Sequence, residues 1–458
     1  MQFGWGMFRR FLLESQYVFK TPLSHHTSII TYTHRRIGSE LQVGFLGGAR
    51  EVGRMGISVK SQKTQLLLDY GVMLERQPGF PMHVPPKEVD ALILTHSHLD
   101  HSGALPIFYI EGKRPLYTNK LNLELTQILI QDFIHLSGYY LPFEYLELKT
   151  MIKSNKHLDY GVSEKVGDTS FQLLNAGHTP GSASVLVEAD GKRLLFTGDF
   201  NLEDTKLLKG ANFDCGDLDG VITESTYASE DHTPRPELEE RFVTACTEVV
   251  SKGGIVLIPA FGVGRAQEIA CTLYGNKFEY PVIFDGMARE ASRVIMNDKE
   301  FLRDPKLFTD AMHSVDWVEG WRDRRRALRN PGVVISPAGM LKGGPSQFYI
   351  SKVGKKANNA VFLVSFQIPG TPGKQLLDKG ICTIDGKVRK IKANVQHFDF
   401  SSHCGATHLK ENLKKLGGKP KVFCVHGAEG NCELLAKWAN TDLGLEAVAP
   451  RTGETFEV

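Results

Sequence analysis

The sequence predicts an α/β protein in which a second, doubly wound parallel sheet is inserted into a first domain. Short apolar runs such as Ala91-Leu-Ile-Leu-Thr and Ile255-Val-Leu-Ile-Pro recur along the chain, broken by glycine or polar residues. Such runs are typical of strands packed on both faces. Helical stretches alternate with them, which favours βαβ units. A strand-end histidine, His426, matches those of the first domain but follows the second set of strands, which indicates an insertion.

The first domain is predicted over residues 41–208 and resumes over residues 381–458. From residue 41 the chain alternates strands with glycine-rich turns, and Asp69 ends the third strand. A helix is expected to open over 103–110, and an amphipathic helix is expected over 121–136. Further strands then lead to the end of the segment.

The inserted domain is predicted over residues 209–380. An acidic amphipathic helix is expected over 236–252, after a strand that ends near Glu224. Buried strands are expected at 255–260, 280–284, 332–336 and 360–364. Helices between these strands make the second sheet doubly wound and parallel.

The leader, residues 1–40, is basic and poor in acidic residues. It holds Arg9, Arg10, Lys20, Arg35 and Arg36 against Glu14 and Glu40. No apolar stretch is long enough for a secretory signal. A flexible extension or an upstream start site is favoured over a mitochondrial-type presequence, because the folded pattern begins abruptly at residue 41.

The bulk composition excludes several classes of protein. The seven cysteines are odd in number and form no CxxC pair, which argues against a disulfide framework or a zinc ribbon and favours a reducing cytoplasm. No stretch reaches the roughly 20 apolar residues that span a membrane. The net charge of +2 neither favours nor excludes nucleic acid, so any RNA-binding charge must be local.

Seven metal-ligating side chains stand just past predicted strands. Five histidines and two carboxylates, without a thiolate, are too many for one tetrahedral ion. We therefore expect two zinc-like ions that share Asp199, which would activate water and stabilise charge on a phosphoryl or acyl oxygen. The candidate ligands are His96, His98, Asp100, His101, His178, Asp199 and His426.

Other polar residues are candidates for supporting roles. Asp69 is expected to orient a ligating histidine, with a plain turn carboxylate as the alternative. His403 is the candidate general acid. Arg265 ends a glycine-rich turn that could hold an anion, and the basic run 321–329 is expected to be a solvated helix face rather than a phosphate site.

The motifs together resemble one family. His96-Ser-His-Leu-Asp-His, with His178 and Asp199, resembles the metallo-β-lactamase superfamily. The segments Glu224-Ser-Thr-Tyr, Ser402-His403 and Val425-His426-Gly427 resemble the three extra motifs of its β-CASP branch. Gly264-Arg-Ala-Gln-Glu and Ser336-Pro-Ala-Gly-Met are also similar to stretches of that branch. The resemblance runs from residue 41 to the C-terminus.

This resemblance implies a four-layered αββα fold interrupted by a β-CASP domain, with a nucleic acid phosphodiester as substrate. It implies one zinc ion held by His96, His98 and His178. It implies a second held by Asp100, His101 and His426, with Asp199 between the two. Glu224 would act with His403 beside the scissile phosphate, and Ser402 and Arg265 are candidate phosphate-binding residues.

The implied function is a cytoplasmic zinc-dependent ribonuclease acting on single-stranded RNA, as an endonuclease, a 5′→3′ exonuclease or both. Asp100, Glu224 and His403 are its candidate catalytic residues. His426 resembles the RNA-cleaving members of the branch, and the motifs resemble archaeal cleavage and polyadenylation specificity factor-like proteins. Residues 1–40 are too short for the RNA-binding KH domain that those proteins often carry, which implies a KH-less form.

Several alternatives stay open at this point. A DNA nuclease of the same branch is opposed mainly by His426. A hydrolase of thioesters or small molecules is opposed by the second sheet, and a non-catalytic subunit by the complete ligand set. The resemblance allows a homodimer and a place in an RNA-processing or decay complex, and no surface feature selects either.

Overall fold

The computed structural model of the protein describes residues 41–74, 78–137 and 140–458. The expectations for the leader, 1–40, lie outside the described residues. Among those described, no helix combines the length and the apolar character needed to cross a membrane.

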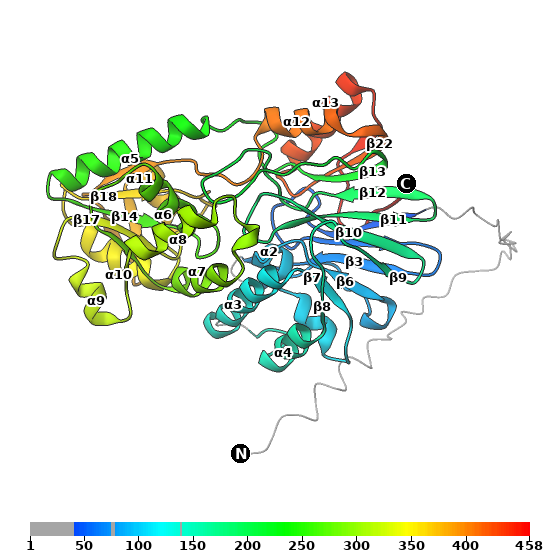
Figure 1. Cartoon of the computed structure of the whole chain (residues 1–458), viewed down its shortest axis with the longest axis horizontal. Helices are drawn as coiled ribbons and strands as arrows, with labels where there is room; N and C mark the ends of the chain where they lie inside the picture. The colour runs from blue at the N-terminus through cyan, green and yellow to red at the C-terminus, as the bar shows by residue number, and fades with distance from the viewer. Residues whose placement is uncertain (1–40, 75–77, 138–139) are drawn as a thin grey trace, which may run out of the picture. The chain divides into compact units, whose positions relative to one another are not determined.

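The first domain contains two seven-stranded sheets that pack face to face (Figure 1). The first sheet consists, in spatial order, of β24 (Thr455–Glu457), β1 (Gln42–Gly47), β2 (Gly56–Lys60), β3 (Gln65–Tyr70), β6 (Ala91–Ile93), β7 (Leu116–Thr118) and β8 (Asn155–His157). The second consists of β23 (Ala447–Val448), β22 (Gly417–Val425), β13 (Asp217–Glu224), β12 (Lys192–Phe196), β11 (Ala183–Ala189), β10 (Thr169–Asn175) and β9 (Ser163–Val166). A short ribbon pairs β4 (Met73–Leu74) with β5 (Pro78–Gly79).

Helices cover the outer faces of both sheets, so the domain has the order αββα. The inner core joins the sheets, and the rings of Phe45 and Phe423 lie 5.3 Å apart across it. On the side of the first sheet lie α2 (Leu99–Ser102), η2 (Leu105–Tyr109), α3 (Lys120–Leu136) and α4 (Tyr145–Lys153), after the connector η1 (Pro86–Glu88). On the side of the second lie α12 (Ala406–Lys415) and α13 (Glu429–Leu443) (Figure 1).

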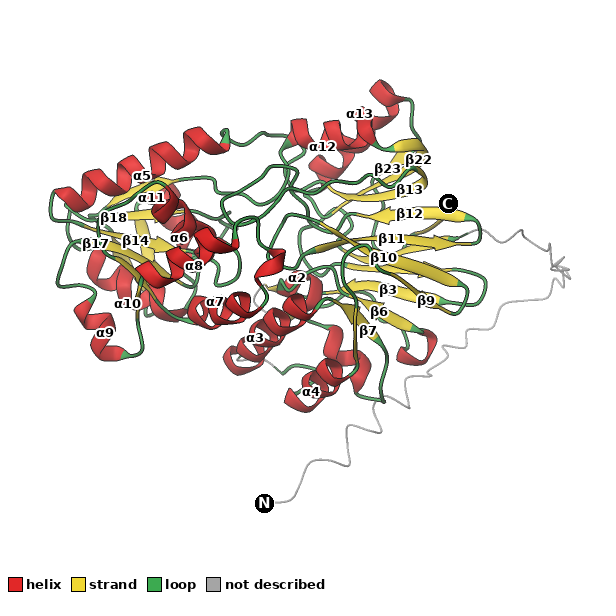
Figure 2. Ribbon diagram, in the orientation of Figure 1, coloured by secondary structure: helices red, strands yellow, loops and turns green. Residues whose placement is uncertain are grey.

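The inserted domain is a six-stranded sheet in which every pairing is parallel. Its spatial order is β16 (Asp316–Trp317), β15 (Val282–Phe284), β17 (Gly332–Ser336), β14 (Ile255–Pro259), β18 (Ala360–Leu363) and β21 (Asn394–His397). One face packs on α5 (Arg235–Ser251), α6 (Arg265–Gly275), α7 (Met287–Asn297) and α8 (Pro305–Ser314), with η3 (Lys299–Phe301) between the last two. The other packs on α10 (Gly344–Val353), α11 (Pro372–Lys379) and the hairpin β19 (Ile381–Ile384) to β20 (Lys387–Lys390). Helices on both faces make the sheet doubly wound (Figure 2).

Two strands belong to a different sheet from the one expected for their position in the chain. β13 lies within the range 209–380 but pairs in parallel with β12 and β22 of the first domain. β21 lies within 381–458 but pairs with β18 of the inserted sheet. The chain therefore leaves the first domain after Glu224 and returns after His397. A buried apolar strand does not reveal which parallel neighbour it will join.

Two of the three expected helices agree with the structure, and one differs. The helices expected over 121–136 and 236–252 are α3 and α5. The segment 103–110 instead forms the 3₁₀ helix η2, with Pro106 in its first turn. The preceding turn, α2, begins inside the histidine motif and carries Asp100 and His101.

A buried carboxylate anchors the basic helix α9 (Trp321–Arg326) to the inserted sheet. Asp285 follows β15 and is fully buried. It accepts hydrogen bonds from Nε of Arg324 at 2.7 Å and Nη2 at 3.1 Å, and from the Tyr349 hydroxyl at 2.9 Å. Arg324 also lies over the ring of Trp321. The paired guanidinium compensates the cost of burying this charge.

We expect Arg324→Met to destabilise the protein by about 2 kcal/mol, because it leaves the Asp285 carboxylate buried without its cation. Urea unfolding followed by circular dichroism measures this as a lower midpoint. The exposed neighbour Arg325→Met is the matched control, expected to stay within about 0.5 kcal/mol. Equal midpoints for both variants would contradict the anchoring role.

Candidate active site

Parallel strand ends bring three of the predicted site residues together. β12, β13 and β22 are parallel neighbours in the second sheet. Asp199 follows β12, Glu224 is the last residue of β13, and His426 follows β22. Since the carboxyl ends of parallel strands meet at one edge of a sheet, these side chains converge there.

The remaining candidates come from β10 and from the first sheet. β10 runs parallel to β12, because each is antiparallel to β11, and His178 lies beyond its end. The histidine motif follows β6 and enters α2. The backbone N–H of Ala183 donates to the carbonyl of Thr95 at 2.8 Å, which joins the motif to the second sheet.

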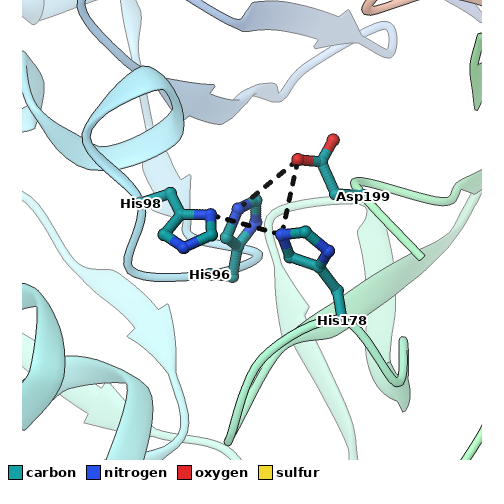
Figure 3. Close-up of side chains that lie close together, drawn as sticks. All are labelled: His96, His98, His178 and Asp199. Atoms are coloured by element: carbon teal, nitrogen blue, oxygen red, sulfur yellow. Dashed lines mark hydrogen bonds and ion pairs between the residues drawn. The ribbon is translucent and has the colours of Figure 1, made fainter. Parts of the chain in front are cut away.

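The first group of ligands consists of His96, His98, His178 and Asp199, and Figure 3 shows their side chains pointing toward one another. The carboxylate Oδ2 of Asp199 lies 3.6 Å from Nε2 of His96 and 3.7 Å from Nε2 of His178. Nε2 of His178 lies 3.2 Å from Nδ1 of His98. Burial lowers the pKa of His98 to about 4 and holds those of His96 and His178 well below their usual value. All three imidazoles are therefore neutral, the form that binds metal.

The second group consists of Asp100, His101 and His426. Nε2 of His426 lies 3.4 Å from Oδ2 of Asp100 and 3.3 Å from Nε2 of His101. Nε2 of His101 also lies 3.3 Å from Oδ2 of Asp199, and Nδ1 of His426 lies 3.3 Å from Oδ1 of the same carboxylate. Asp199 therefore faces both groups.

This donor set fits divalent metal ions. Ligands about 2.0–2.1 Å from one tetrahedral zinc ion lie about 3.3 Å from each other, close to the separations within each group. Nε2 of His96 and Oδ1 of Asp199 are buried and have no hydrogen-bond partner among the described residues. Buried polar atoms without partners are costly, and bound cations would satisfy them.

Asp69 stands behind the ligands and contacts His101. Its Oδ2 lies 2.7 Å from Nδ1 of His101, and its carboxylate also accepts bonds from the backbone and hydroxyl of Thr95 at 2.8 and 2.7 Å. Although burial lowers the pKa of His101, the carboxylates of Asp199 and Asp69 raise it above its usual value. The contact leaves Nε2 of His101 directed at Asp199.

The backbone is strained at two of these positions. Asp69 and His426 have φ values of 56° and 48°, in the left-handed region that side chains disfavour. The N–H of His426 donates to the carbonyl of Gly48 at 2.7 Å, and its carbonyl accepts from Thr226 at 2.9 Å. A side chain at Gly71 would overlap the carbonyl of Asp100, so glycine lets β3 approach the histidine motif.

Glu224 and His403 form the pair that the family resemblance implies. Nδ1 of His403 lies 2.9 and 2.8 Å from the two oxygens of Glu224, which is buried and also accepts from the N–H of Phe200. Nε2 of His403 points the other way and lies 4.0 Å from Asp199. Burial alone would lower the pKa of His403, but the charges of Glu224 and Asp199 raise it to about 9. Because it is protonated at neutral pH, this imidazole can donate a proton beside the two ligand groups.

Arg265 and Ser402 meet beside the first ligand group. Nη2 of Arg265 donates to Oγ of Ser402 at 3.3 Å, and the carbonyl of Ser402 accepts from Nδ1 of His178 at 2.9 Å. Arg235, which the sequence patterns did not single out, lines a pocket together with His98, His178, Arg265 and Ser402. It directly precedes the helix expected over 236–252, and in the structure it is the first residue of α5, where a positive charge opposes the helix dipole.

The basic run 321–329 lies elsewhere in the inserted domain. Arg324 donates hydrogen bonds to Asp285, while Arg322, Arg325 and Arg329 are exposed. This agrees with a solvated helix face.

Family models match three consecutive parts of the chain. The metallo-beta-lactamase superfamily matches residues 59–242, the Beta-Casp domain residues 266–376, and the Zn-dependent metallo-hydrolase RNA specificity domain residues 388–450. The middle match lies within the inserted sheet, and the last spans His403 and His426.

Curated relatives match nearly the whole chain. RNase aCSPSF2 of Saccharolobus solfataricus is 39% identical over 90% of this chain and 84% of its own length. Probable RNase MJ4 of Methanocaldococcus jannaschii is 34% identical over 91% of this chain and 100% of its own length. Transcription termination factor FttA of the same organism is 33% identical over 86% of this chain and 68% of its own length.

A solved structure supports the fold. The crystal structure of a protein of unknown function from Enterococcus faecalis V583 superposes with a TM-score of 0.57 at 14% identity, over 92% of this chain and 100% of that one. The αββα layers, the inserted sheet and the clustered ligands agree with the motifs and with these matches. The chain therefore belongs to the β-CASP branch of the metallo-β-lactamase superfamily.

Proposed function

We propose that this protein is a two-zinc ribonuclease that hydrolyses phosphodiester bonds of single-stranded RNA. The observation that carries the proposal is that Asp199 lies within 3.7 Å of histidines from both ligand groups, beside the Glu224–His403 pair. Relatives named as ribonucleases and the match to an RNA specificity domain support RNA as the substrate. The seven cysteines are all unpaired, which supports the reducing cytoplasm as its compartment.

In this proposal His96, His98 and His178 would hold one zinc ion, and Asp100, His101 and His426 would hold the other. Asp199, which faces both groups, would contribute to both. When bound, the ions would acidify water and stabilise negative charge on phosphoryl oxygens. Asp69 contacts Nδ1 of His101 and thereby leaves Nε2 as the nitrogen available to a metal ion.

The chain's own residues handle the leaving group. Glu224 holds Nδ1 of His403, so Nε2 is the atom that faces the substrate. The oxygen of a water molecule bonds to phosphorus as the P–O3′ bond breaks, and the proton on Nε2 passes to the departing 3′ oxygen. The products therefore carry a 5′-phosphate and a 3′-hydroxyl. Ser402 directly precedes His403 and contacts His178 through its carbonyl, so its hydroxyl and Arg265 would contact phosphate beside the first ligand group.

We expect the purified protein to bind two zinc ions per chain and Asp199→Ala to lose at least one, because both groups use this carboxylate. Elemental analysis after dialysis measures the content. The exposed His397→Ala is the matched control and should keep both ions. An Asp199→Ala variant that retains both would contradict the shared site.

We expect His403→Ala to slow cleavage by about 10²–10⁴-fold, since general-acid catalysis contributes an effect of that size. Its zinc content should equal that of the unaltered protein. Rates on an end-labelled RNA oligonucleotide measure this, with His397→Ala as the control and Asp100→Ala as the inactive reference. An unimpaired His403→Ala variant would remove this residue from the mechanism.

We expect RNA to be cut at least about tenfold faster than DNA of the same sequence, because the 2′-hydroxyl distinguishes the two. The assay uses strands labelled at either end and bearing a 5′-hydroxyl or a 5′-monophosphate. Internal fragments from both forms identify an endonuclease, and mononucleotides from the monophosphate form alone identify a 5′→3′ exonuclease. Cleavage of DNA but not RNA would contradict the proposal and favour the DNA nuclease.

A further inference from the structure

Two arginines, Arg235 buried and Arg265 partly buried, line the pocket beside the first ligand group. Arg235 is only 6% exposed and lies at the first position of α5. Its Nη2 donates to the carbonyl of Ser401 at 3.1 Å, and its guanidinium lies 5.2 Å from the ring centroid of Phe400. Its Nη1 is buried and has no hydrogen-bond partner among the described residues.

Arg265 is incompletely paired in the same way. It begins α6, its Nη2 donates to Ser402, and its buried Nε has no hydrogen-bond partner within the described part of the chain. Burial, together with the charge of Arg235, lowers its pKa to about 10. Two adjacent guanidiniums repel each other unless an anion lies between or beside them.

The nearby carboxylates are engaged elsewhere. Glu268 accepts the backbone N–H groups of Lys206 and Leu207 at 3.1 and 2.9 Å. Asp399 lies 2.6 Å from Nδ1 of His232. Neither forms an ion pair within 4.0 Å of Arg235 or Arg265 in the described residues, so the pocket keeps an excess of positive charge.

The pocket borders the first ligand group. His98, His178 and Ser402 line it together with the two arginines. Ser402 connects the two sites, since its carbonyl contacts His178 and its hydroxyl contacts Arg265. The first turns of α5 and α6 add the positive ends of two helix dipoles.

We propose that Arg235 and Arg265 form an anion subsite for one non-scissile phosphate of the RNA strand. This subsite rests on the proposed ribonuclease function. It positions the RNA strand and takes no part in bond cleavage. The spare N–H groups of two guanidiniums match the oxygens of a phosphate. Arg235 is thereby a substrate-positioning residue. Its role goes beyond beginning α5 and packing against the ring of Phe400.

The test replaces single phosphates of an RNA oligonucleotide by neutral methylphosphonates, one linkage at a time. For the unaltered protein we expect one non-scissile position at which the neutral linkage lowers kcat/KM about tenfold to a hundredfold. In Arg235→Gln that position should lose its effect. Arg241→Gln, on an exposed turn of the same helix, is the matched control and should keep it.

The proposal is overturned if no non-scissile position matters, or if Arg235→Gln responds as the unaltered protein does. Circular dichroism checks that Arg235→Gln is folded. If it is not, Arg235→Lys replaces it. The effect of the neutral linkage should then be smaller than in the unaltered protein, because lysine keeps the charge but lacks the paired N–H donors of a guanidinium.

A second measurement does not depend on cleavage. Inorganic phosphate should raise the melting temperature of the unaltered protein and of Arg241→Gln more than that of Arg235→Gln. Absence of RNA cleavage with this difference intact would refute the ribonuclease and leave the subsite standing. RNA cleavage with equal melting shifts and an unchanged response to neutral linkages would refute the subsite alone.

Discussion

The buried carboxylate of Asp199 is the constraint on which the rest of the site depends. It is 2% exposed and lies within 3.7 Å of ring nitrogens from four histidines. Burial would raise its pKa, but His426 and His101 hold it well below its usual value, so the group stays charged. A buried charge costs several kcal/mol unless it is compensated. The surrounding histidines contribute to that compensation, and the cations that this donor set fits would add to it.

The position of the insertion is tied to the contact between Glu224 and His403. The chain leaves the first domain just after Glu224 and re-enters it shortly before His403. The contact between these two side chains therefore joins the exit and the return. Further contacts reinforce the junction, including the bridge between Tyr227 and Gly405 and the bond from Arg235 to Ser401. Because the crossing segments also carry Ser402, which contacts Arg265 of the inserted domain and His178 of the first, the inserted domain reaches the first ligand group.

Local sequence patterns predicted most of the fold, and their failures have physical causes. Periodicity located α3 and α5, because an amphipathic face is visible in the sequence itself. It could not assign β13 or β21 to a sheet, since strand pairing is decided by distant segments. Nor did it predict that Pro106 would lie in a 3₁₀ turn rather than in a longer helix.

Residue identity and spacing along the chain were enough to predict the candidate ligands, their places at strand ends and the family. Asp69 shows the limit of that reasoning: its type allowed either a turn or a supporting role, and only folding put it 2.7 Å from His101. The sequence patterns did not mark Arg235 as a candidate, and only the fold places it in one pocket with Arg265. Such roles follow only from the folded structure. A side chain's burial, its contacts with distant segments and its lack of a hydrogen-bond partner all depend on how the chain packs.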